Sequence, residues 1–140
     1  MSLHGGTWKV HASALDNEDV IRDALDWLSD GQAEITTENY KSALGAPMST
    51  IVAKMNGKKA KKSFGKMGQE VISELLENGI EDRIDEQKVL HLRLGLAELT
   101  SGEVKIATTS SEPIVKGLFK LEVYPGETPA EVAVGFLEGV

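Results

Sequence analysis

The sequence has 140 residues, with 15 basic and 22 acidic side chains, a formal net charge of −7 and no cysteine. This length predicts one domain spanning residues 1–140. The lack of cysteine excludes disulfides, thiol nucleophiles and cysteine-ligated zinc or iron–sulfur centres. No apolar run approaches the ~20 residues of a membrane span, and no secretory signal pattern opens the chain. We therefore expect a cytoplasmic protein with no membrane association.

The first elements along the chain are a strand and a helix. Apolar residues alternate with polar ones over Trp8–Ala14, which predicts a strand with one apolar face. Asp16 is the expected N-cap of a helix that continues through Leu28 with apolar residues at helical spacing. Gly31 suits the position just beyond the end of that helix.

A hairpin and a long helix are expected next. Residues 33–40 and 48–55 are strand-like, and Gly45-Ala46-Pro47 marks a turn between them. The longest helical pattern runs from Lys58 to about Asn78. Its apolar residues fall on one stripe, which we expect to be buried: Ala60, Phe64, Met67, Val71 and Leu75.

The C-terminal half predicts further strands and a closing helix. Residues 89–94 alternate as a strand, residues 96–101 form a short helical turn, and residues 104–107 and 115–124 form a final hairpin. Thr128 opens the last helix as part of a capping box. Together these elements predict an α+β fold, with an antiparallel sheet of about five or six strands and helices packed on one face.

The basic residues are unevenly distributed. Between Asn39 and Gln69 there are seven lysines and no acidic residue. At 100° per residue, the lysines of the long helix occupy an arc of roughly 160° opposite the apolar stripe. Such a face could neutralise RNA phosphates, or it could be an ordinary solvated helix face. The candidate RNA-binding residues of this stretch are Lys54, Lys58, Lys59, Lys61, Lys62 and Lys66.

The polar side of the predicted sheet is a second candidate surface. Basic side chains there would contact phosphates, and His or Tyr rings could stack on unpaired bases. The alternatives are a solvated sheet face, or a face buried in a homodimer. Strand register decides whether the residues meet. They are Lys9, His11, His91, Arg93, Lys116, Lys120 and Tyr124.

No catalytic or cofactor motif is recognisable. The sequence lacks a phosphate-binding loop, a dinucleotide glycine fingerprint and a nucleophile elbow. The acidic connector at residues 81–86 lacks the spacing of a calcium loop. His4, His11 and His91 form no close-spaced metal motif. We therefore expect a protein that is not an enzyme and that needs no cofactor or metal.

Several segments, in their order and spacing, resemble an archaeal family of RNA-binding proteins described as predicted exosome subunits. The resemblance covers about residues 7–135. It implies a fold like that of the large-subunit ribosomal protein that binds 5S RNA. The segments that carry it are His11-Ala12, Asn17-Glu18-Asp19, Gly45-Ala46-Pro47-Met48, Arg83-Ile84-Asp85-Glu86, Leu90-His91-Leu92-Arg93-Leu94 and Lys120-Leu121-Glu122-Val123-Tyr124-Pro125.

Two hypotheses follow. The first is a non-catalytic RNA-binding protein that acts as an accessory factor in RNA processing or degradation, in association with the exosome. The second is a structural or homo-oligomerising protein with no direct nucleic-acid role. RNA binding is favoured because of the lysine-rich stretch and the family resemblance.

Overall fold

A five-stranded antiparallel sheet organises the molecule, for which the computed structural model describes residues 3–13, 15–109 and 112–139. The strands lie in the order β2-β3-β1-β5-β4, and every neighbouring pair is antiparallel. The expected sheet type is confirmed. The strands are β1 (Leu3–Ser13), β2 (Glu34–Lys41), β3 (Pro47–Asn56), β4 (Val89–Gly95) and β5 (Ile114–Leu121).

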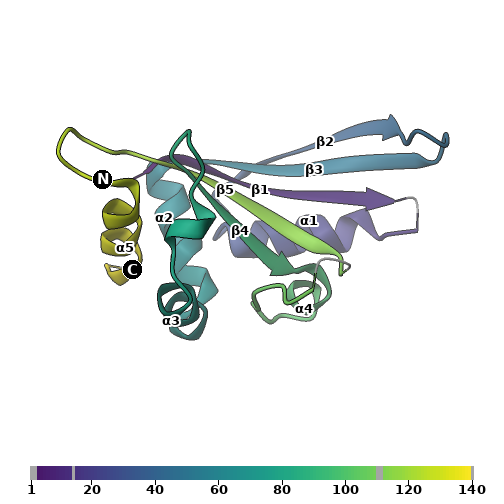
Figure 1. The fold of residues 1–140 in the computed structure, drawn as a ribbon. Helices are drawn as coiled ribbons and strands as arrows, with labels where there is room; N and C mark the ends of the chain where they lie inside the picture. The colour runs from purple at the N-terminus through teal and green to yellow at the C-terminus, as the bar shows by residue number, and fades with distance from the viewer. Residues whose placement is uncertain (1–2, 14, 110–111, 140) are drawn as a thin grey trace.

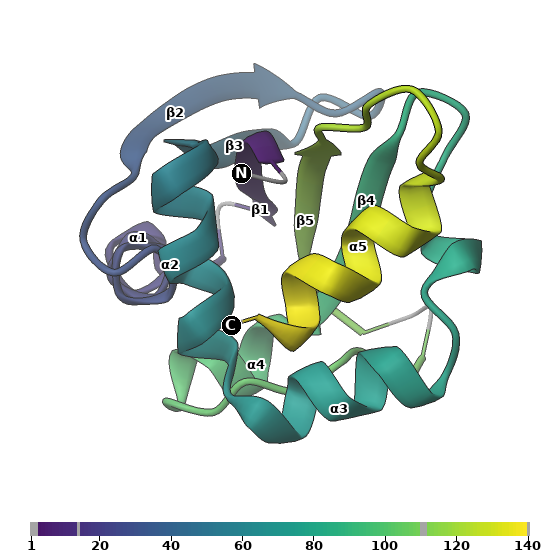
Figure 2. The same ribbon diagram turned by 90° about the vertical axis from the view of Figure 1, so that its left-hand side faces the viewer.

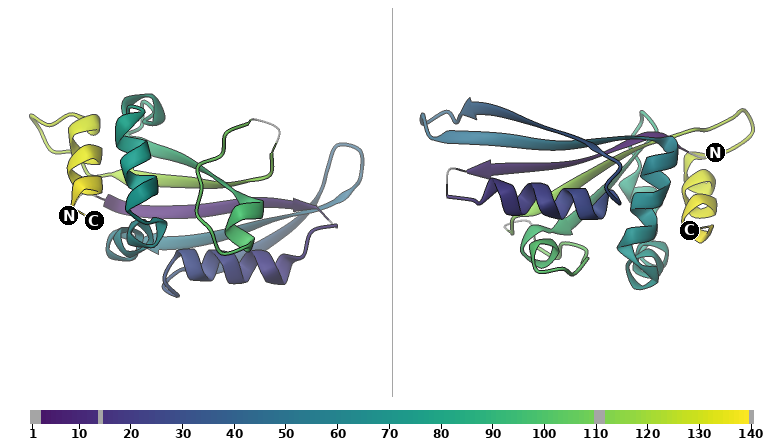
Figure 3. Two further views of the ribbon diagram at one scale, coloured as in Figure 1. Left: turned by 90° about the horizontal axis from the view of Figure 1, so that it is seen from below. Right: turned by 180° about the vertical axis from the view of Figure 1, so that it is seen from behind.

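The α-helices of the described residues all lie on one face of the sheet and leave the other face uncovered (Figures 1 and 3). This arrangement confirms the predicted α+β fold. The expected capping box opens the last helix, where Thr128 and Glu131 exchange hydrogen bonds. The helices are α1 (Glu18–Leu28), α2 (Gly57–Met67), α3 (Gln69–Glu77), α4 (Leu96–Thr100) and α5 (Pro129–Glu138), with a 3₁₀ turn at Glu81–Arg83.

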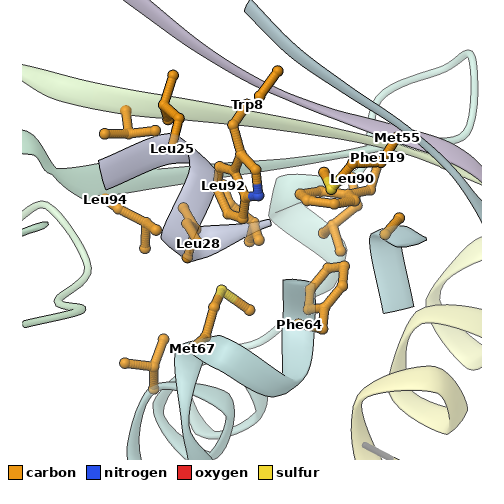
Figure 4. Packing of buried hydrophobic residues seen from close by; sticks show 14 of the residues in the cluster. Trp8, Leu25, Leu28, Met55, Phe64, Met67, Leu90, Leu92, Leu94 and Phe119 are labelled. Atoms are coloured by element: carbon orange, nitrogen blue, oxygen red, sulfur yellow. The ribbon is translucent and has the colours of Figure 1, made fainter. Parts of the chain in front are cut away.

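Large rings fill the core between the sheet and the helices (Figure 4). The ring centroids of Trp8 and Phe119 lie 5.1 Å apart, and those of Phe64 and Phe119 lie 4.5 Å apart. Each ring of β1 and β5 faces a glycine on the paired strand, because Trp8 pairs with Gly117 and Phe119 with Gly6. A Cβ at Gly6 would lie 2.4 Å from the Phe119 ring, and one at Gly117 would lie 2.6 Å from the Trp8 ring. Only glycine fits these two positions.

A buried chain of hydrogen bonds joins β1, α2 and α1. The Trp8 Nε1–H group donates to Ser63 Oγ at 2.6 Å, and the Ser63 hydroxyl donates to the Leu28 carbonyl at 2.7 Å. A buried polar group without a partner costs about 1–3 kcal/mol. These bonds therefore hold Ser63 inward and set the rotation of α2 about its axis, so the lysine side of α2 faces outward.

The prediction of one continuous helix over Lys58–Asn78 is wrong. Gly68 has φ 88° and ψ 156°, a backbone conformation that is almost restricted to glycine, and it separates α2 from α3. Ala60, Phe64 and Met67 are buried from α2, and Val71 and Leu75 are buried from α3. The apolar stripe is therefore buried as expected, although it crosses a break in the helix.

Two smaller expectations are also corrected. Residues 104–107 are not a strand, because only Ile106 forms an isolated bridge, with Leu94. The N-cap of α1 is Asn17, whose Oδ1 accepts from the Asp19 and Val20 N–H groups. Asp16 instead accepts from the Ser13 N–H at 2.7 Å. The predicted first strand extended to Ala14, which lies outside the described residues.

Candidate nucleic-acid interface

The uncovered face of the sheet is cationic across four strands. On β3, β1, β5 and β4, alternate side chains point away from the helices, and every charged one among them is basic. No acidic residue occupies these outward strand positions, although acidic residues outnumber basic ones in the chain. The basic residues of this open face are Lys9, Lys54, Arg93, Lys116 and Lys120.

Three of these cations stand in one row across adjacent strands. Lys9 pairs directly with Lys116, and Lys116 pairs directly with Arg93. Like charges placed opposite each other destabilise a sheet. Within the described residues, none of the three forms an ion pair within 4.0 Å. The positive charge of the row is therefore not neutralised by an ion pair within the described residues.

Edge strand β2 limits this surface on one side. Glu34 lies directly across from Lys54, and Glu38 lies across from Thr50. The sign of the charge thus changes between β2 and β3. A polyanion that lies on the open face is repelled at β2 and is confined to the other four strands.

The two histidines of the open face are both held by hydrogen bonds. His11 Nδ1 lies 3.1 Å from Thr50 Oγ1, and His91 Nε2 lies 2.7 Å from Asp85 Oδ2. The hydrogen bond from His91, together with backbone N–H bonds, lowers the pKa of the Asp85 carboxyl below its usual value. Asp85 is therefore a carboxylate at neutral pH, and it orients the His91 ring beside the cations.

A shallow hollow of about 380 Å³ lies at one end of the open face. Its lining includes Gly5, Gly6 and Thr7 of β1, together with Lys54 and Lys120. The Lys120 ammonium also donates to the Gln87 carbonyl, which fixes its position. The sequence did not predict this hollow, because the first strand was expected to begin at Trp8. In the structure, the alternation of inward and outward residues of β1 continues back through Thr7.

The outward side of α2 forms a separate lysine surface. Lys58, Lys61 and Lys62 are exposed, and Lys59 is half-buried. With Gln32, Asn56 and Gly139, these lysines line a second hollow, of about 830 Å³. Gly139, just beyond α5 (Pro129–Glu138), thus lies near the lysines of α2, and Figure 2 shows the end of α5 beside α2.

The N-terminal end of α2 strengthens this lysine surface. Asn56 Oδ1 caps the helix by accepting from the Lys59 N–H at 3.0 Å. The first turn contains no acidic side chain, so the positive end of the helix dipole adds to the lysine charges. The helix dipole and the lysine charges therefore add to one positive potential on this surface.

Three of the candidate residues lie apart from the groups predicted for them. Lys54 belongs to the open sheet face, not to the lysine surface of α2. Lys66 lies over the Trp27 ring at 4.8 Å and 3.7 Å from Asp30, so its charge is already engaged. Tyr124 lies beyond the end of β5, and its hydroxyl donates to Glu122, which raises the pKa of Tyr124.

Neither a metal site nor a membrane-spanning helix is present in the described residues. No group of three or more His, Cys, Asp or Glu side chains in that part of the chain is arranged to hold a metal ion. No helix among those residues has the length and apolar character needed to cross a membrane. The side chain of Asp85, in the acidic connector, stabilises the turn that contains it by accepting from the Gln87 and Val89 N–H groups.

The fold and the site define an α+β protein with an open-faced antiparallel sheet whose uncovered side is cationic. A family model described as RNA binding matches residues 7–117, so the chain belongs to this RNA-binding family. The resemblance inferred from the sequence is thereby confirmed. No curated protein sequence matches the chain significantly.

Solved structures from archaea share the fold. A DUF54 protein from Methanothermobacter thermautotrophicus superposes with a TM-score of 0.75 at 21% identity, covering 99% of this chain and 96% of its own. A DUF54 protein from Archaeoglobus fulgidus superposes with a TM-score of 0.76 at 25% identity, covering 98% of each chain. A third, from Sulfolobus solfataricus, has a TM-score of 0.71 at 10% identity, covering 97% of this chain and 99% of its own.

Proposed function

We propose that this protein binds RNA without catalysing a reaction on it, and that the open sheet face is the main binding surface. The observation that carries the proposal is the row of Lys9, Lys116 and Arg93, which lie side by side without acidic partners. Phosphate contacts supply most of the sequence-independent affinity for nucleic acid. The lysine surface of α2 provides a second set of phosphate contacts.

The homodimer alternative is less consistent with the same observation. A dimer that buried the open face would bring two copies of the Lys9–Lys116–Arg93 row together, and the desolvated like charges would oppose association. Light scattering at micromolar concentration tests this directly. A stable species of twice 15.1 kDa that fails to bind RNA would favour the structural alternative.

We further propose an accessory role in RNA processing or degradation, in association with the exosome. This part of the proposal rests on the family resemblance and not on the geometry of the site. Affinity purification of the tagged protein from its native host, with and without nuclease, tests it. We expect exosome subunits to co-purify; their absence from both samples would contradict an exosome role.

Fluorescence anisotropy at low salt, with a labelled RNA hairpin, tests RNA binding. The double variant Lys9→Glu/Lys116→Glu should weaken binding more than about tenfold, because two phosphate contacts become repulsive. Lys58→Glu/Lys62→Glu should weaken it to a smaller extent.

The matched control for both pairs is Lys41→Glu/Ser73→Glu/Ala97→Glu, which changes the net charge equally at three exposed positions outside both surfaces. Its effect reports only the long-range change in charge. No binding by the native protein, or an equal loss for the sheet pair and the control variant, would reject the proposal.

A further inference from the structure

We infer that the open sheet face recognises double-helical RNA, by contacting the two phosphate backbones on either side of a groove. This inference rests on the proposed function and specifies the class of RNA that the surface binds. It is carried by the spacing of the cations on the sheet and by the residues that lie between them.

The cations of the open face form one row and two further lysines beyond it. The row consists of Lys9, Lys116 and Arg93. Lys54 lies two residue positions beyond that row and Lys120 lies four beyond it, toward the same end of the sheet. At ~3.3 Å per residue, these two lysines are about 7 Å and about 13 Å from the row.

Between the row and Lys120, the outward residues of β1 and β5 are uncharged. They are Thr7 and Leu118, which pair with each other. Lys54 lies opposite Thr7 at the β3 end of this line, and His91 lies opposite Leu118 at its β4 end. The line adjoins the hollow that Gly5 and Gly6 help to line. A single phosphate chain needs one line of cations, whereas a duplex presents two backbones separated by a groove. A-form RNA has a wide, shallow minor groove that displays 2′-hydroxyl groups. The hydroxyl of Thr7 suits that chemistry, since it both donates and accepts hydrogen bonds.

The open face is poorly equipped to hold unpaired bases. Single-strand binding relies on aromatic side chains that stack with successive bases. The aromatic rings of β1 and β5, Trp8 and Phe119, are both buried on the opposite side. On the four cationic strands, the rings outside the core are those of His4, His11 and His91. A hydrogen bond orients His11 and His91 toward a neighbouring side chain, and His4 Nδ1 lies 3.7 Å from Glu122 Oε2.

Anisotropy titrations with four labelled probes test the inference: an RNA duplex of about 16 base pairs, each of its separated strands, and the DNA duplex of the same sequence. We expect the RNA duplex to bind at least about tenfold more tightly than either strand, and more tightly than the DNA duplex. A single strand that binds as tightly as the duplex would overturn the inference while leaving RNA binding intact. Equal binding of the DNA duplex would overturn the assignment to A-form RNA.

Two variants separate phosphate contact from base stacking. Lys9→Glu/Lys116→Glu should weaken duplex binding more than about tenfold, whereas Lys41→Glu/Ser73→Glu/Ala97→Glu should change it by much less. His11→Ala removes an imidazole but keeps every cation, so duplex affinity should stay within about twofold. A large loss for His11→Ala would indicate stacking and contradict duplex recognition. Failure of the native protein to bind any RNA probe would instead reject the proposed function.

Discussion

At the scale of single residues, the open face combines features that do not favour folding on their own. Lys9, Lys116 and Arg93 repel one another across neighbouring strands, and no acidic side chain of the described residues forms an ion pair with them. Cross-strand pairs of opposite charge typically contribute roughly 0.2–1 kcal/mol, and like pairs cost similar amounts. The proposed binding of RNA phosphates at the row accounts for this arrangement.

This explanation predicts opposite effects of one substitution on stability and binding. In Lys116→Glu, the new carboxylate would lie between Lys9 and Arg93 and replace two repulsive pairs with two attractive ones. Because the site is exposed, we expect the free energy of unfolding to rise by only roughly 0.3–1 kcal/mol. Urea denaturation measures this rise, and the same variant should bind RNA more weakly. A variant that is both less stable and unaffected in binding would contradict the role of the row.

Ser63 provides a second prediction at this scale. Ser63→Ala leaves the Trp8 Nε1–H and the Leu28 carbonyl without their buried partner, which should lower the free energy of unfolding by about 1–3 kcal/mol. Ser73→Ala, at an exposed position of α3, is the control and should change stability by less than ~0.5 kcal/mol. Equal effects of the two substitutions in urea denaturation would show that the buried chain does not hold α2.

At the scale of elements, local patterns predicted most helices and strands, because alternation and helical spacing report which side of each element is buried. The break at Gly68 was missed because the apolar spacing from Phe64 to Val71 is also compatible with a continuous helix. The positive φ of Gly68 ends α2. The sequence does not reveal this φ, because a glycine can also adopt the φ of a helix. The expected strand at residues 104–107 was wrong because a short β-branched pattern also fits an extended connection with one bridge to Leu94.

The break between α2 and α3 can be tested with one type of substitution at two sites. Gly68→Ala forces a side chain into a backbone conformation almost restricted to glycine and should cost of order 1–3 kcal/mol. Gly135→Ala lies within α5, where a Cβ meets no atom within 4 Å, and should stabilise the protein by up to about 1 kcal/mol. Thermal unfolding of both variants checks the opposite signs. A stabilising Gly68→Ala would mean that α2 and α3 form one helix.

At the scale of the whole molecule, charge is segregated between surfaces. The chain carries a net charge of −7, yet the uncovered side of four strands holds only basic charges. The sequence predicted Lys9, Arg93, Lys116 and Lys120 as candidates from alternation within each strand. It could not predict that the first three form one row, because cross-strand register depends on turn geometry and on the irregularity between Leu3 and Gly5.

The same limit explains the assignment of Lys54. Its position in the sequence is close to the lysines of α2, and proximity along the chain suggested one shared surface. Lys54 points outward from β3, whereas Gly57 begins a helix on the covered side of the sheet. The change of direction at Asn56 separates neighbours in the sequence onto two surfaces.

The salt dependence of RNA binding tests the central claim most directly. If the five cations of the open face each neutralise one phosphate of a duplex, the logarithm of the association constant should fall against the logarithm of salt concentration with a slope of about −4.5, at ~0.9 per contact. Lys9→Glu/Lys116→Glu should reduce the magnitude of this slope by about 2, and Lys41→Glu/Ser73→Glu/Ala97→Glu should leave it unchanged. The same slope for the native protein and the Lys9→Glu/Lys116→Glu variant would contradict binding at the open sheet face.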